Sequence, residues 1–306
     1  MIIQFTDLTG CRTGVAFSPK SHFIAMPIRR NAFTLVELLV VIAIIGVLVG
    51  LAAPAVQSMR ESSRRAVCQS RLTAVGMAFQ GYHDRWQHFP VGTVDAKGPI
   101  ESVAEGNHHN WLGRLLELMD QPVIESHIDR SVSVYDKVNA PALELQYPGV
   151  QCPSATQEPA NASTYVGLHH PTEKQIAETD LGVFILNKPI SRNDITDGLA
   201  NTAFVSEKMS WPDDLGWLSG TRATLRNVGG GIRSSIDSFQ SPAPTVVGSI
   251  GSHHPGGTHV LFGSGEIRFQ TVQTNQKILE QIVNRQDGQL PLEFQSLESL
   301  RRKSIE

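Results

Sequence analysis

The stretch Arg29 to Gly46, RRNAFTLVELLVVIAIIG, decides the fold of this chain because it joins a basic flank, a small residue and an apolar run with one acid. From Phe33 to Val56 the only ionisable side chain is Glu37. A helix that rises ~1.5 Å per residue needs about 20 apolar residues to cross ~30 Å of hydrocarbon. The stretch therefore predicts one membrane-spanning helix at residues 33–56.

The order of these features differs from that of a secretory signal peptide. A signal peptide has a shorter apolar core, which precedes its small-residue cleavage site. Here Ala32 precedes the apolar run, and Arg29 and Arg30 precede Ala32. Cleavage after Ala32 would remove a leader of residues 1–32, or a shorter one if translation starts at Met26, and would leave the span attached.

Glu37 is the candidate functional residue of this span. A carboxylate inside an apolar span costs several kcal/mol unless it is paired. Cleavage between Ala32 and Phe33 would create a cationic α-amine at the membrane edge, and Glu37 of a neighbouring copy can neutralise it when the helices pack side by side. We therefore predict Ala32 and Phe33 as the processing site, and Phe33 and Glu37 as an assembly pair.

The segment Ala32 to Glu37, AFTLVE, resembles the prepilin cleavage and methylation motif of type IV pilins and type II secretion pseudopilins. In those families a prepilin peptidase cuts before the Phe and methylates its amine, and the Glu is the fifth mature residue, as Glu37 is here. Gly is more common than Ala before the cut, and Pro54 stands where pilin helices commonly carry a proline. The resemblance implies prepilin peptidase, other pilin-like subunits and the membrane as partners. An ordinary transmembrane anchor is the alternative.

A second resemblance covers almost the entire mature chain. Motifs such as Tyr82-His83-Asp84, Cys152-Pro153-Ser154 and His254-Pro255-Gly256-Gly257 resemble a large bacterial family of pilin-like proteins known only as a domain of unknown function. Its C-terminal signature is His, nine residues, then Asp-Gly. After His254, Ser264 stands in place of that Asp, so a metal or structural role of the Asp becomes doubtful here.

The remaining pattern predicts an α+β, pilin-like fold. A long helix has a transmembrane half at residues 33–56 and an amphipathic half at 57–84, and packs on the antiparallel sheet of an exoplasmic globular head with long loops at 85–306. The amphipathic half is indicated by a stripe with steps of three to five residues, made of Val56, Met59, Ser63, Val67, Leu72, Val75, Phe79 and Tyr82.

Shorter elements are predicted within the head. We expect a helix at 111–119 and strands at 183–186, 202–206, 258–262 and 266–269, the last two as a hairpin around 263–265. Weak periodicity from Met209 to Gly248 predicts long surface loops.

Charge bears on topology and partners. Arg29 and Arg30 favour a cytoplasmic leader, which places the head on the periplasmic side of the inner membrane, although Arg60, Arg64 and Arg65 beyond the span oppose this. Without residues 1–32 the chain loses four of its 26 basic and one of its 29 acidic residues, so the net charge is −6. This balance gives no indication of a nucleic-acid surface.

Cys68 and Cys152 are the only cysteines of the predicted mature chain. Both belong to the exported part, where disulfides form. We predict a disulfide that ties the helix to the head, worth ~2–4 kcal/mol if the geometry permits. Two buried free thiols are the alternative.

Histidine doublets at 108–109, 169–170 and 253–254, with His259 nearby, raise the question of a metal site. Adjacent residues of a strand face opposite sides, and no His-Glu-x-x-His or Cys-x-x-Cys pattern exists, so we predict solvated loop histidines and no metal. Asp194 and Asp197 are calcium candidates, but turn chemistry with Gly198 is the favoured interpretation. No other cofactor is predicted.

Two functional hypotheses follow. No nucleophile elbow or phosphate loop is present, so we predict no enzyme and no catalytic residue. The first hypothesis is a pilin-like or pseudopilin subunit, cleaved by prepilin peptidase and assembled through its N-terminal helix for secretion or a surface filament. The second is a membrane-tethered exoplasmic module that binds carbohydrate or a surface partner, motivated by the polar loops around Trp211, Trp217 and Gly229.

Overall fold

A computed structural model describes residues 34–156, 158–234 and 241–289. The chain forms two compact units, Met1–Ala53 and Pro54–Glu306. The predicted processing residues, Ala32 and Phe33, lie outside the described residues.

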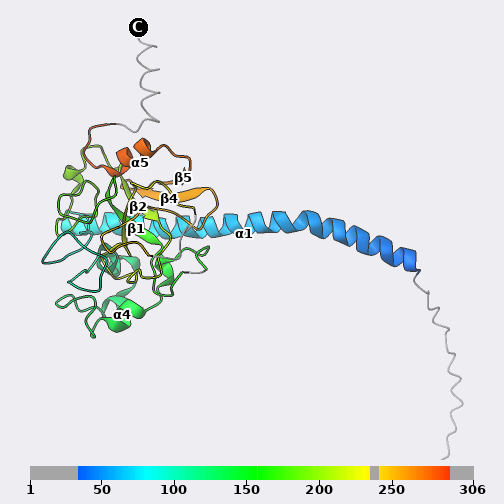
Figure 1. The fold of residues 1–306 in the computed structure, drawn as a ribbon, viewed down its shortest axis with the longest axis horizontal. Helices are drawn as coiled ribbons and strands as arrows, with labels where there is room; N and C mark the ends of the chain where they lie inside the picture. Colours follow the sequence, from blue (N-terminus) through cyan, green and yellow to red (C-terminus); the bar gives the residue numbers. More distant parts are fainter. Residues whose placement is uncertain (1–33, 157, 235–240, 290–306) are drawn as a thin grey trace, which may run out of the picture. The chain divides into compact units, whose positions relative to one another are not determined.

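The dominant element is helix α1 (Leu35–Trp86), which contributes to both units (Figure 1). It begins directly after Thr34, whose hydroxyl accepts a hydrogen bond from the Glu37 amide. It ends at Trp86, slightly later than predicted, and Gln87 then takes a left-handed φ of 62°. Pro90 follows, and a residue before proline is disfavoured in the helical region, so the helix cannot continue far.

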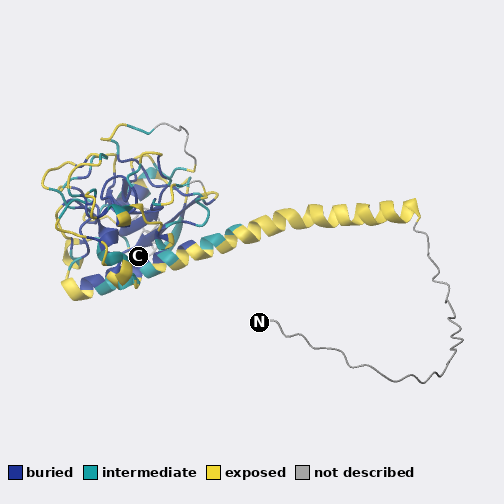
Figure 2. Cartoon of the chain, turned by 90° about the horizontal axis from the view of Figure 1, so that it is seen from below, coloured by how far each residue is buried: buried dark blue, intermediate teal, exposed yellow. Residues whose placement is uncertain are grey.

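The first part of α1 buries no side chain. Residues 34–60 are all exposed, including long apolar side chains from Leu35 to Leu51, as Figure 2 shows in yellow. Among the described residues, α1 is the one helix long and apolar enough to cross a membrane. An exposed apolar run of this length is unfavourable in water, so this part of α1 is the candidate membrane span.

From Cys68 onward α1 turns one face to a protein core. Its buried apolar residues recur at steps of three and four, at Cys68, Leu72, Val75, Phe79 and Tyr82. The predicted stripe is therefore confirmed from Leu72.

The earlier part of the predicted stripe is wrong, because Val56, Met59 and Val67 are exposed. Val56 and Met59 precede the first buried residue by more than two helical turns. Val67 lies about 100° around the helix from its neighbour Cys68.

The head contains one sheet of five strands, in the order β3-β1-β2-β4-β5. The strands are β1 (Tyr165–His170), β2 (Ala203–Glu207), β3 (Leu225–Asn227), β4 (Gly257–Phe262) and β5 (Ile267–Thr271). The β1–β2, β2–β4 and β4–β5 pairs are antiparallel. The β1–β3 pair is parallel. After β2, residues 208–224 cross to the other edge of β1, where β3 runs in the same direction as β1. The predicted α+β, pilin-like class is confirmed, but the sheet is mixed rather than antiparallel.

Helices cover both faces of this sheet. In β4, Leu261 belongs to the core cluster that contains Phe79 of α1, as expected for side chains that alternate along a strand. Its neighbours Val260 and Phe262 belong to a second cluster with Leu279 of α5 (Gln276–Val283), a helix that the sequence did not predict. The sheet is thus buried between α1 and α5.

Three of the four predicted strands are confirmed within about two residues, and 263–265 turn the β4–β5 hairpin. The strand predicted at 183–186 is wrong. The segment is buried, but the Val183 and Phe184 amides both donate to the Leu168 carbonyl, at 3.2 and 3.3 Å. It therefore crosses the end of β1 rather than extending a ladder, and β1 and β3 were not predicted at all.

The other helices are short. The predicted helix at 111–119 is confirmed as α2 and η1, and the Asn110 side chain caps it by accepting from the Gly113 amide at 3.0 Å. The full set comprises α2 (Trp111–Leu115), η1 (Glu117–Met119), α3 (Pro122–Glu125), α4 (Ala140–Glu144), η2 (Pro148–Val150) and η3 (Arg192–Asp194).

The surface loops predicted from Met209 to Gly248 are wrong for most of the described part of that segment. It has little regular structure, yet Trp217, Leu218, Arg222 and Arg226 are all fully buried. Arg222 and Arg226 form ion pairs with Asp214 inside the head, so their polarity did not indicate exposure.

We predict that Phe79→Ala lowers the free energy of unfolding by ~3–5 kcal/mol, because it removes a buried aromatic side chain. The Phe79 ring lies 5.2 to 6.5 Å from the rings of Phe89, Trp111, Phe184 and Phe204. Denaturant unfolding of the full chain in detergent, followed by tryptophan fluorescence, measures the change. Met77→Ala is the control, since Met77 of the same helix is 66% exposed. Equal losses in the two variants would contradict this account of the core.

Candidate functional site

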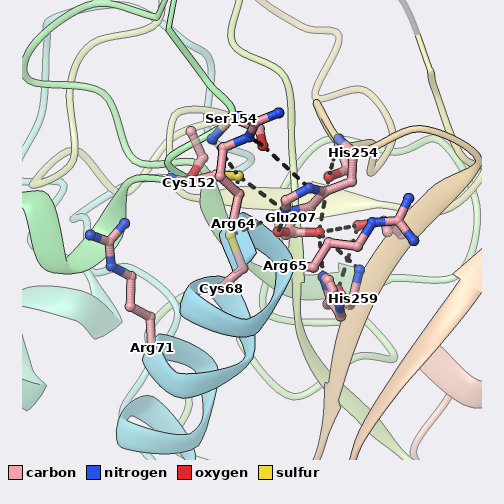
Figure 3. Close-up of polar contacts among 12 residues, drawn as sticks. Arg64, Arg65, Cys68, Arg71, Cys152, Ser154, Glu207, His254 and His259 are labelled. Atoms are coloured by element: carbon pink, nitrogen blue, oxygen red, sulfur yellow. Dashed lines mark hydrogen bonds and ion pairs between the residues drawn. The ribbon is translucent and has the colours of Figure 1, made fainter. Parts of the chain in front are cut away.

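Side chains from four separate segments converge beside α1 in the Pro54–Glu306 unit (Figure 3). Cys68 belongs to α1, Cys152 follows η2, Glu207 ends β2, and His254 lies in the loop before β4. One ligand atom of each lies within 4.8 Å of all the others. We call these residues the four-residue cluster. Their exposed fractions are between 0 and 4%, so the cluster is closed to solvent.

Local hydrogen bonds hold the two loop residues of the cluster. The Cys152 amide donates to Thr164 Oγ1 at 2.6 Å, next to the start of β1. The His254 amide donates to Ser252 Oγ at 3.1 Å. The backbone of each loop residue is therefore fixed by the side-chain hydroxyl of a nearby residue.

The imidazole of His254 lies at the centre of the cluster. Its Nε2 atom is 3.2 Å from Cys68 Sγ, 3.3 Å from Cys152 Sγ and 3.3 Å from Glu207 Oε1. The two sulfur atoms are 3.1 Å apart, and both cysteines are free thiols. The structure thus brings the predicted pair Cys68 and Cys152 together, and the disulfide between them stays a prediction.

Glu61 holds the other side of the His254 ring. His254 Nδ1 lies 2.5 Å from Glu61 Oε1, and because a carboxylate only accepts, Nδ1 carries the donated proton. Glu61 precedes Cys68 by seven residues, so both lie on one face of α1 two turns apart. Arg64 and Arg65 pair with Glu61 at 2.6 and 3.6 Å.

Glu207 divides its two oxygens between different tasks. Oε2 accepts from the His259 amide at 2.9 Å, from Ser252 Oγ at 3.0 Å and from His259 Nδ1 at 3.2 Å. Oε1 is buried and has no hydrogen-bond donor among the described residues. It faces the cluster through its 3.3 Å ion-pair contact with His254 Nε2.

These contacts move the pKa values of the cluster. The Cys68 thiol donates to Cys152, and with help from His254 this lowers the pKa of Cys152 to about 5 against the effect of burial. Burial opposes the charge of His254, but contacts with Cys152 and Glu207 raise its pKa to about 10. Burial also opposes the charge of Glu207, yet His254 and His259 lower its pKa. The contacts of Cys152 with Cys68 and His254 therefore favour its thiolate, the form in which cysteine binds metals or acts as a nucleophile.

The histidines predicted to be solvated are mostly buried, so that prediction is wrong. His108, His109, His169 and His170 are each no more than 8% exposed. They have partners inside the head, for example His169 Nδ1 with Asp180 Oδ2 at 2.8 Å. Within the described part of the chain, His254 is the doublet residue that joins the cluster.

The calcium candidates Asp194 and Asp197 both accept backbone hydrogen bonds. Asp194 Oδ2 accepts from the amide and hydroxyl of Ser191, at 2.8 and 2.7 Å, in a capping box of η3, and Gly198 has a φ of +86°. Asp197 accepts from the amides of Asp287 and Gly288, at 2.8 and 2.9 Å, which are distant in sequence. The turn interpretation therefore holds for Asp194 and Gly198 but not for Asp197, and calcium binding stays an untested prediction.

The loops that motivated a binding module contain a buried charge network. Asp214 is contacted by Lys208 at 2.5 Å, Arg226 at 3.0 Å and Arg222 at 3.3 Å, and all four side chains are at most 1% exposed. Trp211, itself 6% exposed, lies under the guanidinium groups of Arg226 and Arg222 at 4.0 and 5.2 Å. Trp217 is fully buried. The loops around these two tryptophans are therefore packed into the head at Trp211 and Trp217, and neither ring is exposed.

At the start of α1, Glu37 is engaged within its own chain. The amide and hydroxyl of Thr34 both donate to Glu37 Oε2 at 2.8 Å, and the Glu37 amide donates back to Thr34 at 3.3 Å. This is a capping box, which satisfies amides that a helix start leaves open. Glu37 Oε1 has no partner among the described residues. The predicted partner, Phe33, lies outside them.

Residues 57–277, more than half of the chain, match the family described as "Protein of unknown function (DUF1559)". The chain belongs to this family. Residues 28–53 match a second description, "Prokaryotic N-terminal methylation motif", so this DUF1559 member is pilin-like with a prepilin-type N-terminus. No curated protein and no solved structure matches the chain. The four-residue cluster lies wholly within the DUF1559 region, and Ala32, Phe33 and Glu37 lie within the methylation motif.

The signature of the family that this chain resembles has an Asp where Ser264 stands, and this position lies outside the four-residue cluster. Ser264, which stands in its place, is an exposed residue of the β4–β5 turn. Its hydroxyl accepts from the Glu266 amide at 3.4 Å, and it is not one of the four cluster residues. The substitution therefore changes none of the four residues of the cluster.

Sequence analysis missed Glu207 and Glu61. The available signal for Glu207 was its place at the end of an apolar strand segment, where an acid is buried only with partners. For Glu61 it was the seven-residue spacing to Cys68 on one helix face.

We predict that Asp214→Ala lowers the free energy of unfolding by ~3–5 kcal/mol, because it leaves three buried cations without their shared counter-ion. Asp213→Ala is the matched control. Its carboxylate pairs with Arg222 at 2.5 Å but is 49% exposed, so we expect a change of ~0–1 kcal/mol. Denaturant unfolding of both full-length variants tests the difference, and a tolerated Asp214→Ala would refute the network's importance.

Proposed function

We propose that this DUF1559 protein is a structural pilin-like subunit. Prepilin peptidase cuts it between Ala32 and Phe33, α1 inserts its first part in the membrane, and copies assemble through their N-terminal helices. The match of residues 28–53 to the methylation motif supports this proposal most directly.

The electrostatics of Glu37 support the assembly step. Thr34 donates twice to Oε2, which orients the carboxylate without neutralising its charge. A charged group among exposed apolar side chains costs several kcal/mol in hydrocarbon unless it is paired. The methylated amine of Phe33 from a neighbouring copy supplies the missing positive charge, and Oε1 is the oxygen left to receive it.

The surface of the first part of α1 suits side-by-side packing. Gly46 and Gly50 are four residues apart, and nothing lies within 4 Å of the position that a Cβ would take at either. Small residues at this spacing allow two helices in a membrane to approach closely. The same exposed surface can therefore face lipid before assembly and other helices after it.

We place the head on the periplasmic side of the inner membrane, in a type II secretion or related filament system. Arg29 and Arg30 favour a cytoplasmic leader. The basic residues beyond the span oppose this less than their number suggests, because Arg64 and Arg65 pair with Glu61. The positive charges of Arg64 and Arg65 are therefore engaged in ion pairs within the head.

A membrane-tethered binding module is the second candidate. The buried tryptophans no longer favour it, but an apolar cavity does. The cavity has a volume of ≈ 780 Å³ and is lined by α3 and α4 residues together with Tyr147 and Pro148. This volume falls within the range of small-molecule sites.

We expect the mature protein to begin with N-methylated Phe33. Mass spectrometry of the N-terminal peptide, from protein produced in a host with prepilin peptidase, tests this. The same protein made in a peptidase-deficient strain is the control and should retain residues before Phe33. An intact leader in both strains would remove the pilin-like proposal.

We expect Glu37→Gln to abolish cross-linkable oligomers while membrane insertion and cleavage persist, because glutamine keeps the shape but loses the charge. Thr34→Val is the matched control, since it removes the hydroxyl contact to Glu37 and leaves the carboxylate charged. In vivo cross-linking reports oligomers. If oligomers are never detected in the unmodified protein, the tethered module gains, and if both variants fail alike, local capping rather than charge pairing explains Glu37.

A further inference from the structure

The four-residue cluster has the donor set of a metal site. We propose that Cys68, Cys152, His254 and Glu207 bind one divalent transition-metal ion of the zinc type, which ties α1 to the head. This structural site is independent of cleavage and assembly at the N-terminus.

Four of the six separations between donor atoms are close to those of a tetrahedral zinc site, and all six are within 4.8 Å. Zinc bonds of ~2.0–2.3 Å give donor separations of about 3.3–3.8 Å in tetrahedral geometry. The observed separations that include His254 Nε2 are 3.2, 3.3 and 3.3 Å, and the sulfurs are 3.1 Å apart. The sulfurs need to separate by only several tenths of an ångström to admit the ion.

The orientation of His254 suits coordination. Its Nδ1–H donates to Glu61 Oε1 at 2.5 Å, so Nε2 is the ring nitrogen that faces the two sulfurs and Glu207, and it becomes a ligand when the ion displaces its proton. Histidine ligands of metals typically donate their other ring N–H to a carboxylate in this way. Glu61 is therefore a positioning residue for His254.

Glu207 provides the observation that points most directly to a missing partner. Four donors contact its Oε2, whereas its Oε1 is buried, receives no hydrogen bond from the described residues and faces the cluster, where it has the 3.3 Å ion-pair contact with His254 Nε2. A buried carboxylate oxygen without a hydrogen bond is costly, and a cation bound among the four donors removes that cost.

The charges of the surrounding residues balance those of the ion and its ligands. Two thiolates and one carboxylate around a divalent ion leave one negative charge. Glu61 adds another, and Arg64 and Arg65, which pair with Glu61, supply two positive charges. The assembly is therefore close to neutral, as burial requires.

The chemistry of the ligands selects the metal and its role. Thiolate and imidazole ligands favour zinc over calcium or magnesium. All four side chains are buried and none of the four positions is left for water, as in structural rather than catalytic zinc sites. Because the ligands come from α1, the η2–β1 segment, β2 and the loop before β4, the ion would link four parts of the head.

A disulfide between Cys68 and Cys152 is the competing state, since the same two sulfurs cannot serve both. A disulfide forms when two thiols lose two protons and two electrons to an oxidant. It would use two of the four groups and leave Glu207 Oε1 without an ion. The convergence of all four donors is what favours metal.

Elemental analysis of the full chain, purified in detergent from zinc-supplemented cells, tests the proposal. We expect about one zinc per chain. Cys152→Ser and His254→Asn should reduce this to near zero, whereas the control His253→Asn, at the adjacent position outside the cluster, should retain it. Glu61→Gln should keep the stoichiometry but weaken zinc affinity about 10- to 100-fold.

Measurements on the unmodified protein keep the test valid if ligand variants fail to fold. Cobalt should replace zinc and give thiolate-to-cobalt charge-transfer bands and tetrahedral d–d bands. Alkylation after chelation and denaturation should label both cysteines. A Cys68–Cys152 disulfide found by mass spectrometry in metal-free protein would overturn the proposal, as would reduced protein that binds neither ion. The mature N-terminus is unaffected by either result, so the pilin-like function is judged separately.

Discussion

A negative charge placed among apolar side chains is the constraint on which the proposed biology of this chain depends. Glu37 is the only ionisable residue between Phe33 and Val56, and Thr34 satisfies one of its oxygens without cancelling its charge. In hydrocarbon that charge requires a cation, which in the proposed assembly is the processed N-terminus of a neighbour. Cleavage, insertion and assembly are then linked: without the cut there is no amine, and without the amine the carboxylate has no partner in the membrane.

The two parts of α1 have different surroundings, and the sequence of each part has the pattern that its surroundings require. Residues 34–60 of α1 bury nothing, whereas from Cys68 to Tyr82 a narrow apolar face is fully enclosed. Such patterns are local, so the helix, the hairpin of β4 and β5, and the α+β class could be predicted from the sequence. Exposed apolar residues such as Met59 could not be separated from core residues by spacing alone, because their environment depends on where the head begins.

Buried polar residues account for the errors in the predicted loops and histidines. The weak periodicity after Met209 predicted surface loops, yet Asp214 and Trp211 allow Arg222 and Arg226 of that segment to be buried beside Lys208. The same reason applies to the cluster. Cys68 and Cys152 could be paired by elimination, but Glu207 and His254 join them from other segments, and His254 is 186 residues from Cys68, a separation that no spacing rule encodes.

The position of the cluster along α1 explains why a strong link is useful there. Cys68 is the first buried residue of the helix, so it marks where contact between α1 and the head's core begins. Glu37 precedes Cys68 by 31 residues of α1, so any force applied through Glu37 reaches the head's core first at Cys68. When a helix is pulled away from a core by one end, its contacts break one after another, starting at the end to which the force is applied. An ion bound by Cys68 and by three other segments of the head would distribute the force over all four segments at once. The contacts of Leu72, Val75 and Phe79, which follow Cys68 along α1, would then be protected.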